Sequence, residues 1–144
     1  MRTKSFMAKL EHDRIVQAIA AAEAKTSGEI RVFIQRGEID DVVAAARARF
    51  QKLHMIATRE RNAVLIFVAP RSQKFAVIGD EGIHQRCGDE FWQQLVTAIG
   101  DHFKREDFTS AIVRAIEVSG ERLAEHFPRA AGDRNELPDT VEEG

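Results

Sequence analysis

The stretch that decides the fold reads AVLIFVA from Ala63 to Ala69, PRSQ from Pro70 to Gln73 and KFAVI from Lys74 to Ile78. The first run is apolar without alternation, a pattern typical of a central strand that is buried on both faces. Because the four residues after it favour a turn, we expect the chain to reverse there. The second run then returns as an antiparallel neighbour of the first. The sequence therefore predicts a hairpin inside a sheet.

A third strand is predicted upstream of this hairpin. Residues 29–35 alternate with a period of two and are rich in β-branched side chains. After a turn, Asp40 or Asp41 is placed to cap a helix, whose apolar stripe consists of Val42, Val43, Ala46, Phe50 and Leu53. A strand, a helix and a strand at this spacing imply a right-handed crossover. We therefore expect residues 29–35 and 63–69 to pair in parallel.

Further helices are predicted on either side of these strands. An alanine-rich helix carries Leu10, Ile15, Ile19 and Ala22 at helical spacing and ends near Ser27-Gly28. After the hairpin, one amphipathic helix opens at Gly88-Asp89 and a second follows it. Their apolar stripes are Phe91, Leu95, Ile99 and Phe103 in the first, and Phe108, Ile112, Ala115 or Ile116, Ser119 and Leu123 in the second. The order α-β-α-β-β-α-α predicts an α/β protein: a layered α/β/α sandwich with a mixed central sheet and helices on both faces.

Composition limits the classes of function. The 21 basic and 23 acidic residues nearly cancel, so no overall positive field favours a nucleic-acid partner. The single cysteine, Cys87, excludes an internal disulfide and a multi-cysteine zinc site, and it suits a reducing compartment. The longest apolar run is far shorter than the roughly 20 residues of a transmembrane helix. With no secretory signal at the N-terminus, these features favour a cytoplasmic protein without a transmembrane segment.

The 144 residues amount to about one domain. We assign residues 1–128 to this domain and residues 129–144 to a C-terminal tail. The tail is acidic, lacks apolar periodicity and is interrupted by Gly132 and Pro138. We therefore expect it to be mobile or to lie over the surface.

Carboxylates gather where the last predicted strand ends and the next helix begins. Asp80 and Glu81 follow the strand, Asp89 stands at the predicted helix start, and Glu29 begins the first strand. We predict a Ca²⁺ or Mg²⁺ site with these four residues as ligands, because hard cations bind carboxylate oxygens on irregular backbone. Each residue also has a structural alternative: Asp89 as a helix N-cap, Asp80 and Glu81 as solvated turn residues, and Glu29 as an exposed edge residue or an ion-pair partner of Arg31.

Several motifs, taken in order, resemble the TPM domain family. They are GEIRV at 28–32, RNAVLIFV at 61–68, GDEGI at 79–83 followed by Asp89, and Phe103 followed by Asp107-Phe108. The resemblance covers Leu10 to Phe127 and is greatest to the short stand-alone bacterial branch. Relatives include a thylakoid lumen acid phosphatase and proteins linked to photosystem repair. The resemblance implies the same α/β sandwich, a divalent cation, often calcium, near the end of the sheet, and weak phosphatase activity in some members.

Two functional hypotheses follow. In the first, the chain is a divalent-cation-binding domain that serves as an interaction or accessory module for a protein partner. In the alternative, the metal supports a weak phosphatase that acts on phosphate monoesters. The sequence shows no nucleophile paired with a base and no basic clamp for phosphate, so it names no catalytic residue and favours the module.

Overall fold

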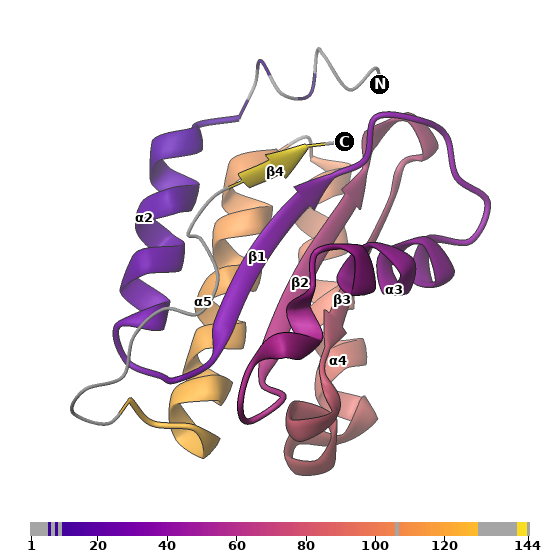
Figure 1. Cartoon of the computed structure of the whole chain (residues 1–144). Coiled ribbons are helices and arrows are strands. Elements are labelled where there is room, and N and C mark those ends of the chain that lie inside the picture. The colour runs from indigo at the N-terminus through magenta and orange to yellow at the C-terminus, as the bar shows by residue number, and fades with distance from the viewer. Residues whose placement is uncertain (1–5, 7, 9, 106, 130–140, 144) are drawn as a thin grey trace.

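A four-stranded mixed sheet forms the centre of the molecule in the computed structural model, which describes residues 6, 8, 10–105, 107–129 and 141–143 (Figure 1). The side chains of residues 89, 98 and 141–143 lie outside this description. The strand order is β3-β2-β1-β4, with bounds β1 Glu29–Ile34, β2 Ala63–Ala69, β3 Lys74–Gly79 and β4 Val141–Glu143. β1 and β2 are parallel, and β2 and β3 are antiparallel. Both predicted pairings are confirmed.

Helices cover both faces of this sheet. α2 (His12–Glu23), α4 (Glu81–Lys104) and α5 (Phe108–His126) pack on one face, and α3 (Val42–Lys52) packs on the other (Figure 1). The larger core joins the side chains of the three helices to alternate residues of β1 and β2. The smaller core joins α3 to the remaining residues of the same strands. The predicted α/β/α sandwich is therefore confirmed. Among the described helices, none has the length and apolar character of a membrane span.

β1 is buried on both faces even though its sequence alternates. Ile30, Val32 and Ile34 lie in the larger core. Glu29 and Arg31, on the opposite face, are only 1% and 6% exposed. The alternative in which Glu29 is an exposed edge residue is wrong, because its side chain is buried.

α3 begins as the sequence predicts and turns most of the predicted stripe inward. The Asp41 carboxylate accepts hydrogen bonds of 3.1 Å from the backbone N–H groups of Val43 and Ala44, which confirms it as the N-cap. Ala46 and Phe50, four residues apart, are buried, whereas Val43 is 43% exposed. Val43 lies one residue after the position, four residues before Ala46, that would share their face, so its predicted place in the stripe is wrong. Two short 3-10 helices, η1 (Met55–Ala57) and η2 (Pro70–Ser72), flank β2.

α4 begins about two turns before the predicted start. Asp80 is its N-cap, and its carboxylate accepts a 2.8 Å hydrogen bond from the N–H of Glu81. The helix is broken at Gly88, whose φ of 75° and ψ of 170° are non-helical. The N-cap of the helical segment that follows the break is therefore Gly88. The alternative in which Asp89 is the N-cap is wrong.

The end of the chain joins the sheet. Val141 to Glu143 form β4, which lies parallel to β1 with Val32 opposite Val141. Residues 130–140 and 144 lie outside the described residues. Residues 141–143 are therefore part of the sheet, whereas most of the tail that we expected to be mobile or to lie over the surface falls outside the described residues. Three residues are too few to show a strand period, and the reason they pair is the open edge of β1.

Candidate functional site

The predicted acidic site lies at the edge of the sheet where β1 and β2 begin and β3 ends. The backbone N–H of Glu29 donates to the carbonyl of Asn62 at 3.4 Å, and the N–H of Asp80 donates to the carbonyl of Ala63 at 2.9 Å. These hydrogen bonds run across the first residues of neighbouring strands. They therefore place Glu29, Asn62 and Asp80 side by side at one end of the strands, which we call the acidic edge.

A single guanidinium bridges the two adjacent carboxylates of this edge. Arg61 Nε lies 2.7 Å from Asp80 Oδ2, and Arg61 Nη2 lies 2.8 Å from Asp80 Oδ1, which is a bidentate pair. Arg61 Nη1 also lies 3.3 Å from Glu81 Oε2. Two of the four predicted metal ligands, Asp80 and Glu81, are thus brought together around a cation that the chain itself supplies.

The three charged side chains differ in their access to water. The Asp80 side chain is 5% exposed, Arg61 is 42% exposed and Glu81 is 69% exposed. The hydrogen bond to Asp80 raises the pKa of Arg61 above its ordinary value; desolvation opposes this rise, and the negative charges of Asp80 and Glu81 add to it. Arg61 therefore remains charged, and Asp80 is not the solvated turn residue of the structural alternative, whereas Glu81 is largely solvated.

The loop that carries Arg61 is held against the first turn of α4. Arg61 has a left-handed φ of 53°, and its carbonyl accepts a 2.9 Å hydrogen bond from the N–H of Gly82. A Cβ on Gly82 would overlap the Glu60 carbonyl and would lie 2.7 Å from the Arg61 carbonyl oxygen. Only glycine lets the two segments approach this closely, so Gly82 fixes the position of the guanidinium.

Asn62, next to Arg61, adds a buried oxygen to the same edge. The residue is 1% exposed, and its Nδ2 donates to Ser27 Oγ at 3.2 Å. Its Oδ1 is buried and accepts no hydrogen bond from any described residue. A buried amide oxygen without a donor is uncommon in folded proteins. Sequence reasoning assigned no role to Arg61 or Asn62, although their place directly before a buried strand, across from the end of its antiparallel neighbour, is a signal that could have found them.

The other two predicted ligands are less closely associated. Glu29 belongs to the edge, but it is buried on the sheet face that α3 partly covers. Asp89 follows the break at Gly88, and its side chain lies outside the description. Within the described part of the chain, no three His, Cys, Asp or Glu side chains gather as a metal site.

The donor chemistry of this edge nevertheless suits a hard cation. Asp80 and Glu81 offer carboxylate oxygens and Asn62 offers an amide oxygen, and these are the ligand types that Ca²⁺ and Mg²⁺ take. Calcium needs six to eight oxygens, more than these three side chains supply. Any metal held here would retain water and would compete with Arg61 for Asp80.

Comparison with known proteins agrees with this fold. Residues 2–122 match the family model of the TPM domain. The NMR structure of BA42 protein from the psychrophilic bacterium Bizionia argentinensis is similar, with 40% sequence identity and a TM-score of 0.86 over 93% of this chain and 92% of that chain. No curated protein matches the sequence.

Proposed function

The chain belongs to the TPM domain family, and we propose that its acidic edge binds a divalent cation, Ca²⁺ or Mg²⁺, in a domain that acts as an accessory or interaction module. The observation that carries this proposal is the Arg61 guanidinium held between the carboxylates of Asp80 and Glu81. Two carboxylates that share one positive group form a place where a cation is favourable. A divalent ion would bring twice the charge of the guanidinium to the same oxygens.

Access to the two carboxylates depends on Arg61. Its side chain is 42% exposed, so it can turn into solvent and leave Asp80 and Glu81 to a metal. Asn62 offers a buried oxygen without a hydrogen-bond donor among the described residues. Glu29 and Asp89 are proposed as further ligands of the same site. Because the guanidinium competes, we expect binding to be weak, closer to the millimolar range of extracellular calcium modules than to that of cytosolic buffers.

The described residues give more support to a module than to the weak phosphatase. Within them, no serine, threonine or cysteine side chain donates a hydrogen bond to a histidine or a carboxylate, the arrangement that activates a nucleophile. Desolvation raises the pKa of Cys87, which favours its thiol over the reactive thiolate. Arg61, the arginine at the acidic edge, is already bound by two carboxylates. The cytoplasmic location and the protein partner stay predictions.

Calcium titration of the melting temperature tests the site, with one substitution to separate ligation from helix capping. Binding to the folded state stabilises by about 2.7 kcal/mol at a ligand concentration of 100 times Kd. Asp80→Asn should abolish this response. Asp41→Asn is the matched control, since Asp41 caps α3 through the same kind of hydrogen bond far from the acidic edge. It should keep the cap, because asparagine caps a helix about as well as aspartate, and it should keep the full calcium response.

Arg61→Gln gives the sharper result. Removal of the competing guanidinium should raise the affinity for calcium, although it weakens the contact between the loop and α4. An unchanged or lower affinity in Arg61→Gln would contradict the proposal. Hydrolysis of an aryl phosphate at ordinary enzymatic rates of about 1 to 10³ per second, lost in Asp80→Asn, would establish the phosphatase instead.

A further inference from the structure

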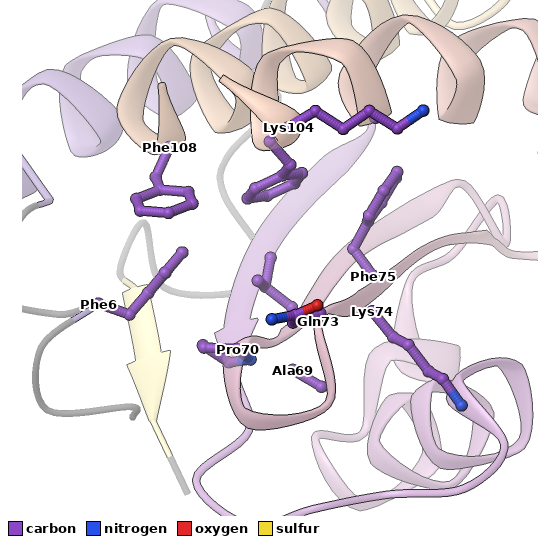
Figure 2. A pocket seen from close by; sticks show the side chains of 11 residues that line it. Phe6, Ala69, Pro70, Gln73, Lys74, Phe75, Lys104 and Phe108 are labelled. Atoms are coloured by element: carbon purple, nitrogen blue, oxygen red, sulfur yellow. The ribbon is translucent and has the colours of Figure 1, made fainter. Parts of the chain in front are cut away.

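A pocket of about 460 Å³ opens between the β2–β3 connection and the helices α4 and α5 (Figure 2). Its floor is formed by the end of β2 and the start of η2, at Ala69 and Pro70. Gly100 and Lys104, from the last turns of α4, line the opposite side. The volume falls within the roughly 300–1,000 Å³ of small-molecule sites.

Four aromatic rings form a continuous wall of this pocket. The centroids of the Phe6 and Phe108 rings are 4.7 Å apart, and those of Phe108 and Phe103 are 5.8 Å apart. The Phe103 and Phe75 centroids are 5.0 Å apart. The four residues come from segments far apart in the sequence, yet they converge on one space. A flat apolar body placed there would gain stacking and edge contacts in addition to burial.

Polar side chains line two sides of the pocket. The Gln73 amide lies between Pro70 and Phe75 in Figure 2, and Gln73 holds a left-handed φ of 53°. Lys74 and Lys104 both line the pocket. The Lys74 ammonium donates to the Asp40 carbonyl at 2.7 Å, whereas Lys104 makes no hydrogen bond or ion pair with any described residue. The pocket therefore has an amide on its hairpin side and an available positive charge on its α4 side (Figure 2), and no acidic side chain lines it.

The pocket also has a defined place in the sheet. The pocket lies at the carboxyl end of β2, whereas the acidic site lies at the amino ends of β1 and β2. The two sites are at opposite ends of the sheet.

We propose that this pocket binds a small organic anion with a flat aromatic body and one carboxylate. The apolar body occupies the space between the four rings. The carboxylate lies on the α4 side of the pocket, where it meets the Lys104 ammonium. This site goes beyond the proposed cation site and uses none of its residues.

Titration of the isotope-labelled protein with 2-naphthoate, followed by NMR, tests the proposal. We expect saturable shifts at the amides of Gln73, Gly100 and Lys104, and weaker binding of the neutral analogue 2-naphthamide. Lys104→Gln should weaken 2-naphthoate about threefold to fivefold, the effect of one partly exposed ion pair, and should leave 2-naphthamide unchanged. Lys52→Gln, which removes an exposed lysine from α3 on the other face, should change neither affinity.

Two further variants complete the design. Gly100→Met should fill the pocket and weaken both ligands more than tenfold, with folding checked by the dispersion of the amide spectrum. Asp80→Asn should leave 2-naphthoate binding unchanged, so failure of the cation site would not affect this result. Absence of saturable shifts at the pocket would overturn the proposal. Equal affinities for the two ligands, insensitive to Lys104→Gln, would overturn its anionic part.

Discussion

Two helical glycines should respond to the same substitution in opposite directions. Replacement of glycine by alanine inside a helix gains about 0.8–1.0 kcal/mol of helix propensity. At Gly100 in α4, the new Cβ would lie 3.8 Å from Phe75 Cζ, an ordinary contact, so we expect Gly100→Ala to stabilise by about 1 kcal/mol. At Gly120 in α5, it would lie 2.7 Å from the Cβ of Ala22 on α2. Overpacking of this kind costs about 1–3 kcal/mol, so Gly120→Ala should show a net loss of up to about 2 kcal/mol.

Urea denaturation measures both changes, which should appear in the midpoint with an unchanged slope. The two variants should differ by about 1–3 kcal/mol. A double variant, Gly120→Ala with Ala22→Gly, moves the methyl group to the other side of the same contact, and it should relieve the clash. The reasoning is refuted if Gly120→Ala stabilises as much as Gly100→Ala. It is refuted equally if Ala22→Gly lowers the stability of Gly120→Ala by as much as it lowers that of the unchanged protein.

Two other predictions concern Cys87 and β4. Burial raises the pKa of the Cys87 thiol above its ordinary value of 9.0, so its contribution to stability is fully present below pH 9 and is lost as the pH rises through the higher folded-state pKa. Alkylation by iodoacetamide at pH 8 should be slower in the folded protein than in urea, and equal rates would contradict this. Deletion of residues 141–144 should cost about 1–3 kcal/mol in urea denaturation, because β1 loses the hydrogen bonds of one ladder. It should also cause concentration-dependent association through the exposed edge, whereas unchanged stability and light scattering would show that β4 contributes nothing.

Hydrophobic pattern predicts most of this fold because burial follows it closely. The continuous apolar run of β2 is buried on both faces, as its lack of alternation indicates. Every predicted stripe residue of α5, from Phe108 to Leu123, is buried. Pairing direction followed from the length of each connection, since a short turn leaves room only for a hairpin and a crossover helix gives a parallel pair.

The sequence-based predictions were wrong where a contact between distant segments decides the local structure. Gly79, Asp80 and Gly82 are poor helix formers, so the sequence indicated a turn. The structure starts α4 there because Asp80 caps it and because Gly82 must accept the close approach of Glu60 and Arg61. β4 depends in the same way on the open edge of β1, which the residues of β4 cannot show.

The candidate site was predictable only as a set of like charges. Asp80 and Glu81 are adjacent in the sequence, and their common position follows from that. Their partner Arg61 lies 19 residues before Asp80, and the hairpin between them brings the two ends together. The acidic residues alone do not indicate that strand pairing brings the Arg61 guanidinium to them. The structure was therefore needed to show that the site contains a positive charge.

The parallel pairing of β1 with β4 has a consequence for biosynthesis. Among the strands that the structure describes, β1 leaves the ribosome first, and β4, which closes its outer side, leaves it last. At about 5–20 residues per second, the backbone of Val32 to Ile34 waits several seconds for its partner. During that interval, the nascent chain presents an open edge to any other extended segment nearby. The pairing of Val32 to Ile34 with β4 therefore forms only after the other described strands have been made.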